Sequence, residues 1–566
     1  MATIPISSAD PVNAMRGVRA GDTLALQPGE HRQPLVIQGA AGTESRPIVI
    51  RPASARTGRA VLTSGLSESD ARRWANTEAD RRQRAGYYPV IGHLGDQAML
   101  VLRHCRYVAI HGLDFDDCWP TAIYLDNCQY VVIHDVRFRG GTFAIGANGI
   151  DTHDIVVQHC HWQQDRSGRV MWHSVPWGRI HGAKNNSSAP DVDLENDYRH
   201  WDGDFFRAWN IAGNVIIRRN TVQDAFNAVH FFNSFDTLAP GVAADRLAFN
   251  GGRQSAANVL IEHNRFLRIR DNIFEPEQHA WNWVIRHNHV EDGYRPFSFE
   301  FERAGWFYVY GNTFSFVSPP SQHMSPEDQA IFPKAEWRKS VSVFKPKGVQ
   351  ANEGPIYVAN SSFYMESGKG ILPKFGLGKL LHVNNAMQFK KPEKARMFGN
   401  DGAIETKRPY ALDNELKAEI SRFTRRWGDY QIEVNGDIGN DIHFPDHYRS
   451  LGYRLGLASV QANPRFVDPA GAGGAAPDFT PRAAAARNTA IALRLEFPDG
   501  NAHALSGGHH RGAVQPDGFY RGFDRLFRFL PSDSWLPDLP APRPPNGTDA
   551  TRRHGVARAK AASRRA

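Results

Sequence analysis

The sequence predicts an all-β fold, namely a right-handed parallel β-helix (a solenoid) with loop insertions and a small C-terminal capping region. Two observations predict this fold. Short segments rich in β-branched and aromatic residues recur along much of the chain, and many of them end in a polar turn that contains Asn. The same segments lack the amphipathic pattern, about 10 residues long, that a helical solenoid would need.

The repeat is visible in two sets of segments. Residues 105–115 and 128–138 share a pattern that starts with Cys and Tyr and ends with Phe. A second set carries Asn at both ends of an apolar strand, and it includes residues 214–220, 258–264 and 282–288. Alternation within each strand indicates one buried face, and stacked strands lie ~4.8 Å apart. Asn at one turn position in successive coils therefore predicts a ladder of side-chain amides along the axis.

We expect residues 1–390 to form the β-helix, residues 391–530 to form a C-terminal capping region that packs on it, and residues 531–566 to be a disordered Pro-rich and then basic tail. The following stretches interrupt the repeat: 64–92, 166–204, 236–255 and 318–339. Long insertions in a solenoid project from one side and often wall a binding groove.

Charge and composition exclude some classes of protein. The formal net charge is +8, which favours a polyanionic partner. The basic residues are not gathered with aromatic residues, so we expect no nucleic-acid partner. No apolar run approaches the ~18–20 residues of a membrane span. The cysteines (Cys105, Cys118, Cys128, Cys160) have no CxxC spacing, and we expect them to be small buried residues.

A row of ionisable residues is the strongest functional signal. Residues 229–232, 274–277, 299–302 and 344–347 align as four strands of one sheet, and alternation points the second and fourth residue of each strand outward. The expected outward rows are His230, Glu275, Glu300 and Lys345, then Phe232, Glu277, Glu302 and Lys347. Carboxylates ~4.8 Å apart repel each other unless cations compensate, so this pattern predicts a functional site.

Two kinds of chemistry fit these rows. In the first, Glu275, Glu277, Glu300 and Glu302 hold Ca²⁺, which neutralises the carboxylate of a substrate uronate. A basic group then removes the adjacent proton in a β-elimination. The candidate bases are Lys345, Lys347, Arg303 and His230.

In the second kind of chemistry, two of the carboxyl groups hydrolyse a glycosidic bond. Vertical neighbours about 5 Å apart suit a retaining mechanism, and a diagonal pair such as Glu275 and Glu302 suits an inverting one. The rows do not distinguish hydrolysis from elimination.

The insertion at residues 166–204 supplies candidate substrate-binding residues. The two Asp residues of the segment 202–204 resemble a metal-binding or catalytic pair, and aromatic rings can stack on sugar rings. The candidates are Asp202, Asp204, Trp172, His173 and Trp201.

Several segments resemble the chondroitinase B/alginate lyase family of polysaccharide lyases, which are secreted bacterial β-helix proteins. These are residues 20–30, residues 42–50 and the closing phrase at residues 462–470. The resemblance implies Glu-x-Glu ligands to calcium with a Lys base nearby, and residues 299–303 are the closest local match. The family's Asn-Lys-Ser-Gly segment is absent.

We therefore expect a carbohydrate-active enzyme whose partner is an acidic polysaccharide or oligosaccharide, and most of all a uronate polysaccharide lyase. A glycoside hydrolase, a uronate epimerase and a non-catalytic glycan-binding β-helix are the alternatives. Residues 1–10 show no basic region followed by an apolar run, so no signal peptide is recognisable. The fold analogy nevertheless predicts a secreted or periplasmic protein.

Overall fold

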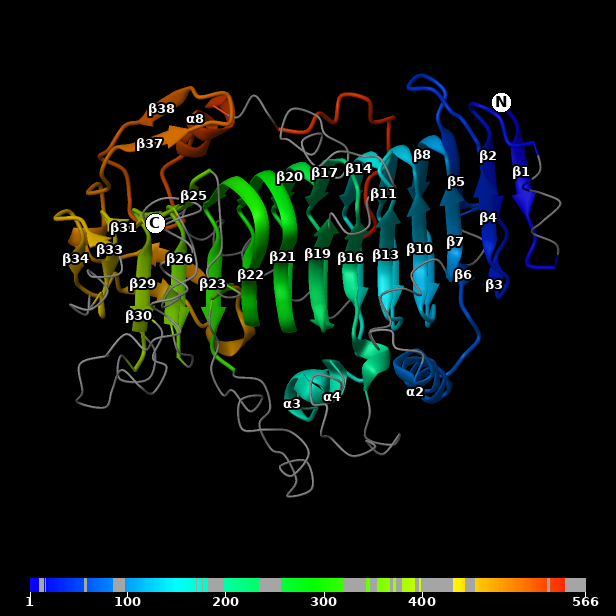
Figure 1. Ribbon diagram of the computed structural model, residues 1–566, viewed down its shortest axis with the longest axis horizontal. Coiled ribbons are helices and arrows are strands. Elements are labelled where there is room, and N and C mark those ends of the chain that lie inside the picture. The colour runs from blue at the N-terminus through cyan, green and yellow to red at the C-terminus, as the bar shows by residue number, and fades with distance from the viewer. Residues whose placement is uncertain are drawn as a thin grey trace, which may run out of the picture.

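The computed structural model is a right-handed parallel β-helix, as the sequence predicts, with its coils stacked along one long axis (Figure 1). Three parallel sheets, here called sheets I, II and III, run along this axis, and a typical coil contributes one strand to each. The structure describes residues 1–9, 15, 17–54, 59–84, 97–168, 170–175, 177–181, 198–233, 256–318, 343–346, 354–366, 370–372, 379–391, 396–398, 431–442, 453–526 and 530–544.

The strands of each sheet pair in parallel with the next coil. Sheet I contains β4 (Leu35–Gln38), β7 (Ala98–Arg103), β10 (Thr121–Asp126), β13 (Phe143–Asn148), β16 (Asp204–Trp209), β19 (Asn227–Asn233), the middle of β21 (Arg265–Arg286), the middle of β22 (His289–Tyr310) and β24 (Phe344–Pro346). Sheet II contains β1 (Thr3–Ile6), β2 (Thr23–Leu26), β5 (Ile48–Pro52), β8 (Arg106–His111), β11 (Gln129–His134), β14 (His153–Gln158), β17 (Gly213–Arg218), β20 (Ala257–Glu262), the ends of β21 and β22, β25 (Ile356–Ala359), β28 (Lys379–Val383), β31 (Gln431–Asn435) and β33 (Tyr453–Leu455). Sheet III contains β3 (Gly29–His31), β6 (Ala60–Leu62), β9 (Asp114–Asp116), β12 (Arg137–Arg139), β15 (His161–Gln163), β18 (Thr221–Ala225), the starts of β21 and β22, β23 (Thr313–Phe316), β26 (Ser362–Met365), β29 (Ala386–Phe389), β32 (Ile438–Gly439) and β34 (Val460–Gln461).

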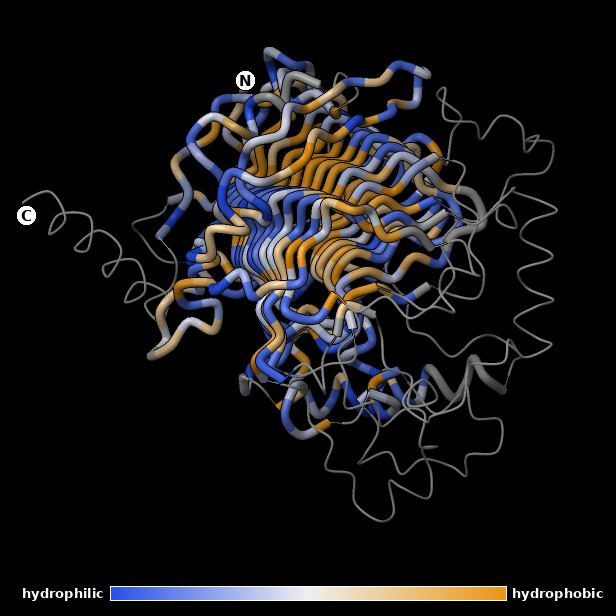
Figure 2. The backbone as a smooth tube through the Cα atoms, turned by 90° about the vertical axis from the view of Figure 1, so that its left-hand side faces the viewer, coloured by the Kyte–Doolittle hydropathy of each residue, from blue (hydrophilic) through white to orange (hydrophobic). Residues whose placement is uncertain are grey.

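The core is a set of columns in which like side chains stack on like. Phe274, Phe297 and Phe344 stack in sheet I with ring centroids 5.0 Å and 4.7 Å apart. Viewed along the axis, hydrophobic residues of successive coils line up in continuous bands (Figure 2). The cysteines are free and buried in this core, as predicted. The chain thus buries its apolar surface coil on coil rather than around one centre.

The predicted Asn ladder is confirmed at the turn between sheets II and III. The Nδ2 groups of Asn220, Asn264 and Asn288 each donate to the Oδ1 atom of the next Asn, and Asn312 ends the run, at distances of 3.0, 3.0 and 3.1 Å. Each Oδ1 also accepts the backbone N–H of the Asn in the preceding coil. The left-handed residue of these turns is the one before the Asn, such as Arg219 with φ 56°.

A second amide ladder lies at the start of the sheet II strands. Asn258 donates to Asn214 at 3.0 Å and Asn282 donates to Asn258 at 2.8 Å. Here the ladder residues themselves have positive φ values, between 53° and 59°, a region that Asn tolerates better than most residues. Both corners of sheet II are thereby held in register by side-chain amides.

Two of the predicted insertions form helices beside the coils, near the lower edge of Figure 1. The first contains α2 (Glu68–Arg84), and the second contains α3 (Val170–His173), α4 (Trp177–His181) and the 3₁₀ turn η4 (Arg199–Trp201). In the part of the chain that the structure describes, no helix has the length and apolar character needed to cross a membrane.

The β-helix extends beyond the predicted boundary at residue 390. Strand β31 pairs in parallel with β28, and β33 pairs with β31, so the coils continue to residue 461. The remaining short elements are β27 (Gly370–Leu372), β30 (Arg396–Phe398), β35 (Phe466–Asp468), η8 (Ala472–Gly474), β36 (Asp478–Pro481), η9 (Ala484–Ala486), β37 (Leu493–Glu496), β38 (Ala502–Leu505) and α8 (Phe519–Leu526). The hairpin β37–β38 and α8 cover the outer face of sheet II, where Phe497 packs on Tyr308 and Phe523 on Tyr310.

The prediction of a disordered tail from residue 531 onward is wrong for residues 531–544. Residues 530–544, here called the C-terminal strap, lie across the early coils. Arg543 forms ion pairs with Asp114 at 3.1 Å and Asp135 at 2.9 Å, and the strap carbonyl of Pro540 lies 2.9 Å from His134 Nε2. These contacts hold the strap on the coils, and a Pro-rich composition alone does not predict them. Residues 545–566 lie outside the described residues.

The Asn ladder generates a prediction for stability. Replacing buried Asn264 by Ala should lower the free energy of unfolding by about 2–4 kcal/mol, because two neighbouring coils lose partners for buried amides. Denaturant unfolding measures the loss, and amide exchange should be faster at Asn220. The control is Gln33→Ala, which removes an exposed amide and should change stability little. Equal effects of the two substitutions would contradict a stabilising ladder.

Candidate active site

A cluster of ionisable side chains occupies the outer face of sheet I on strands β16, β19, β21, β22 and β24. Two rows of residues run across these strands. The first row is Arg207, His230, Glu275, Ser298 and Lys345, and the second is Trp209, Phe232, Glu277 and Glu300. The members that carry ionisable groups, together with Asp204 and Asp271, are here called the acidic cluster.

The register of β22 differs from the prediction. Glu300 lies beside Glu277, and Ser298, not Glu300, lies in the row of Glu275 and Lys345. The alternating pattern could not show this, because a slip of two residues leaves the same face of a strand inward. The aromatic column decides the register, since Phe297, and not Phe299, pairs with Phe274 and Phe344.

His230 lies at the centre of the acidic cluster. Its Nδ1 atom is 3.3 Å from Asp204 Oδ1 and 3.2 Å from Glu275 Oε2, and its Nε2 atom is 3.2 Å from Glu277 Oε2. Arg207 contacts the His230 ring and lies 3.5 Å from Asp204 Oδ2. One imidazole on β19 therefore joins three carboxylates from the two neighbouring strands, β16 and β21.

The surroundings separate the protonation states of the two Glu side chains on β21. Burial and Arg207 lower the pKa of His230, but the Glu275 and Asp204 carboxylates outweigh them and raise it to about 10. Burial raises the pKa of Glu275 to about 7, against the charge of His230. Burial also raises the pKa of Glu277, but the hydrogen bond between Glu277 and His230 outweighs burial and lowers this pKa to about 2. Glu275 therefore holds a proton more readily than Glu277 does.

Lys345 closes the other side of the acidic cluster. Its Nζ atom lies 3.0 Å from Glu300 Oε1. Burial lowers the pKa of Lys345, but the charges of Asp271, Glu275 and Glu300 raise it above its ordinary value. Asp271 is itself buried at the start of the sheet I part of β21, and sequence reasoning missed it.

The acidic cluster opens to solvent at one side. The side chains of Lys345, Glu277 and Glu300 are 26%, 19% and 11% exposed, whereas that of Glu275 is 6% exposed. A ligand on sheet I would therefore meet Glu277, Glu300 and Lys345 first. Glu275 and Asp204 lie beneath them.

Three carboxylates of the acidic cluster have the arrangement of a cation site. Glu275, Glu277 and Glu300 each offer an oxygen, and these oxygens lie within 4.8 Å of one another. Ca²⁺ binds carboxylate oxygens at 2.3–2.6 Å, so one ion can reach all three. Asp204, His230 and Glu275 form a second close group, but protonated His230 is a poor metal ligand. The donor set at Glu275, Glu277 and Glu300 fits a hard divalent cation.

The structure brings together some of the predicted site residues and separates others. His230, Glu275, Glu277, Glu300 and Lys345 belong to the acidic cluster. So does Asp204, which was predicted among the substrate-binding residues of the insertion. The side chains of Glu302, Arg303 and Lys347 lie outside the described part of the structure.

The predicted substrate-binding residues of the insertion have different roles. Trp172 and Trp201 are 1% and 2% exposed, so neither offers a ring face to a sugar. Trp201 packs in a small hydrophobic cluster of the insertion, and Trp172 Nε1 donates to the carbonyl of Ser318 at 3.2 Å. Asp202 is also buried and pairs with His181 at 3.3 Å. His173 is exposed at the end of α3. The prediction that both Trp rings stack on substrate is therefore wrong.

Sequence reasoning also missed Arg207, Ser298 and Asn272. Ser298 is fully buried between Glu275 and Lys345, and its Oγ has no hydrogen-bond partner among the described residues. Asn272 donates to Glu275 Oε1 at 2.8 Å. Aligning residues 206–209 with residues 229–232 would have shown Arg207, because both segments alternate in the same way.

Comparison with known proteins adds a likeness of fold. No protein-family model matches the chain, and no curated protein matches its sequence. Among solved structures, the chain is similar to a mannuronic acid specific polysaccharide family 6 lyase from human gut microbiota, with 12% identity, a TM-score of 0.36, and coverage of 76% of this chain and 96% of that one. It is also similar to pectate lyase Pel9A (12% identity, TM-score 0.35, 74% and 84% covered). A third similar structure is the tailspike protein of E. coli bacteriophage HK620 in complex with a pentasaccharide. The identity is 12% and the TM-score 0.33, and the match covers 80% of this chain and 57% of that one. These three similarities concern the parallel β-helix fold alone.

The ion pairs of His230 generate a prediction for pH dependence. Its pKa is raised from 6.5 to about 10, so their contribution to stability is full below pH 6.5 and is lost as the pH rises through 10. His230→Gln should lower the free energy of unfolding by about 3–5 kcal/mol at the lower pH, because it removes the imidazolium that pairs with buried Asp204 and with Glu277. The difference in free energy of unfolding between wild type and His230→Gln should shrink toward the higher pH. Denaturant unfolding of wild type and variant across this pH range measures this difference.

The control is His503→Gln, which replaces an exposed imidazole on β38 and should give a small difference at every pH. A loss for His230→Gln that stays constant up to the higher pH would contradict the assigned charge state of His230.

Proposed function

We propose that this chain is a carbohydrate-active enzyme that cleaves an acidic polysaccharide at the acidic cluster of sheet I. The observation that carries the proposal is the convergence of Asp204, Glu275, Glu277 and Glu300 with His230 and Lys345 on five successive strands. Gathering so many charges out of water costs free energy, and such clusters with displaced pKa values are typical of functional sites.

The reaction that we propose is β-elimination on a uronic-acid polymer. The proton beside the uronate carboxyl group is removed, the glycosidic C–O bond breaks, a C=C bond forms, and the leaving oxygen takes up a proton. Lys345 is the candidate base because it is the most exposed basic side chain of the acidic cluster that the structure describes. His230 stays protonated and is the candidate source of the proton for the leaving oxygen.

Glu275, Glu277 and Glu300 would hold a Ca²⁺ ion in this proposal. The ion would supply two positive charges, which offset part of the negative charge of the three carboxylates and of the uronate carboxylate. A cation on Glu275 and Glu300 would offset two of the three carboxylates that raise the pKa of Lys345. Burial, which lowers this pKa, would then be opposed mainly by Asp271. Lys345 could then accept a proton.

The separated protonation states on β21 favour a second candidate, glycoside hydrolysis. Glu275, with a pKa of about 7, can serve as the acid, and ionised Glu277 as the nucleophile or base. The oxygens of the two groups approach within 4.8 Å, which is near the ~5 Å spacing of retaining enzymes.

A product assay tests the proposal. The protein is incubated with a panel of polyuronates and neutral glycans, and the absorbance of unsaturated uronate and the number of reducing ends are followed. Elimination should produce both signals on a polyuronate. Reducing ends without new absorbance would support hydrolysis instead, and binding without any product would contradict catalysis.

The role of Lys345 gives a prediction for activity. Lys345→Gln should lower turnover about 10²–10⁴-fold, because a general base contributes a factor of that size. Steady-state rates on the cleaved polyuronate measure the loss. Lys391→Gln, an exposed Lys next to β29, should leave the rate unchanged. Unchanged turnover in Lys345→Gln would rule out Lys345 as the base.

The proposed cation site gives a prediction that does not depend on activity. Isothermal titration calorimetry should detect Ca²⁺ binding to the purified protein after chelator treatment, and Glu300→Gln should weaken it about tenfold or more, because a charged ligand is lost. Glu44→Gln, an exposed carboxylate far along the chain, is the control. Equal Ca²⁺ affinity in wild type and Glu300→Gln would show that the ion does not bind at the acidic cluster.

A further inference from the structure

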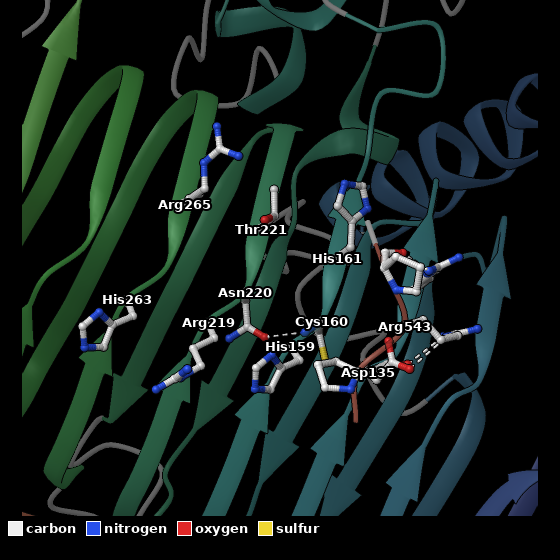
Figure 3. Close-up of a pocket in the computed structure, with 13 residues that line it drawn as sticks. Asp135, His159, Cys160, His161, Arg219, Asn220, Thr221, His263, Arg265 and Arg543 are labelled. Carbon is white, nitrogen blue, oxygen red and sulfur yellow. Dashed lines mark hydrogen bonds and ion pairs between the residues drawn. The ribbon is translucent and has the colours of Figure 1, made fainter. Parts of the chain in front are cut away.

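A second site lies at the turn between sheets II and III, on the other side of the coils from the rows of sheet I. It is a groove with a volume of about 640 Å³, within the ~300–1,000 Å³ range of ligand pockets. Strands β12, β15, β18 and the start of β21 form its floor, and the C-terminal strap forms one wall (Figure 3). It shares no residue with the acidic cluster, and we call it the basic groove.

The Asn ladder creates the floor of the basic groove. Cys160, Asn220 and Asn264 point inward at the same turn position of three coils, so the residues on either side of each point outward. Two outward rows result: His159, Arg219 and His263 before the ladder position, and Arg137, His161, Thr221 and Arg265 after it. Figure 3 shows the two rows side by side, separated by Cys160 and Asn220.

The lining of the basic groove is cationic. It contains the guanidinium groups of Arg137, Arg219, Arg265 and Arg543, and its one carboxylate is that of Asp135. Asp135 is paired with Arg543 at 2.9 Å, and the four guanidinium groups of the lining outnumber this one carboxylate. Burial and the charge of Arg543 lower the pKa of Arg137 and outweigh the opposing charges of Asp114 and Asp135.

The rows have the spacing of a polymer rather than of a single ion. Neighbouring coils place equivalent side chains ~4.8 Å apart, a distance comparable with the length of one sugar ring. A chain of uronate or sulfated sugars laid along the axis can present one anionic group to each coil. Guanidinium groups bind carboxylate and sulfate through paired N–H donors.

We infer that the basic groove is a non-catalytic binding site for an acidic glycan. The preference for a polyanion rests on the groove alone, whereas the choice of a glycan rests on the proposed function. A nucleic acid is a less suitable occupant, because the groove residues that the structure describes include no aromatic ring of Phe, Tyr or Trp on which bases could stack. The groove would hold a stretch of polymer while another stretch lies on sheet I.

The test uses Arg219→Asn combined with Arg265→Gln in the full chain. Asn suits position 219 because φ is 56° there, so the substitution does not strain the turn. Binding of a fluorescent polyuronate, a sulfated glycosaminoglycan, a neutral glucan and a single-stranded DNA is measured at two salt concentrations. Arg494→Gln, an exposed Arg on β37, is the matched control.

We expect the double variant to lose about tenfold in affinity for each guanidinium removed, with a weaker salt dependence and unchanged unfolding. The two anionic glycans distinguish carboxylate from sulfate recognition. Turnover on short oligosaccharides should stay at the wild-type level, so a failure of catalysis and a failure of the groove remain distinguishable. An affinity equal to that of Arg494→Gln would overturn the inference. A selective loss of DNA binding would assign the groove to nucleic acid.

Discussion

The register of one coil on the next is the constraint on which the whole structure depends. Each strand has only its neighbours in the adjacent coils to satisfy its backbone, so an error in one coil would displace every side chain that follows. Two kinds of side-chain column hold the register here. The amides of Asn220, Asn264 and Asn288 fix the corner of sheet II, and the stacked rings of Phe274, Phe297 and Phe344 fix sheet I.

The same columns place chemistry on opposite sides of the coil. On sheet I, the outward residues between inward Phe side chains collect carboxylates and their counter-charges around His230. At the ladder turn, the outward residues between inward amides collect Arg and His. On sheet I and at the ladder turn alike, stacked uncharged residues point inward and fix the spacing of the charged residues that point outward. The two surfaces differ in sign, and so they suit different parts of one polymer or different ligands.

Much of the fold could be predicted because its signals are local and repeated. The Asn positions, the alternation within each strand and the buried cysteines all follow from short stretches of sequence. The register of β22 could not be predicted, because residues 297, 299 and 301 are all Phe and alternation accepts any of them opposite Phe274. Asp204 and Arg207 were hard to place because the insertion before β16 hides where that coil begins. The packing of residues 531–544 depends on partners about 400 positions away, which no local pattern reveals.

The C-terminal strap changes what holds the solenoid together. An open stack of coils can fray from either end, because each coil is bound only to its neighbours. The strap joins the last part of the chain to early coils through Arg543, and it is anchored on the way by Asp533 on Arg218 and by Trp535 against Tyr130. Peeling away the final segment therefore exposes groups on several early coils at once. This connection couples the unfolding of the C-terminal segment to that of the early coils it crosses, which makes the unfolding of a repetitive protein more cooperative.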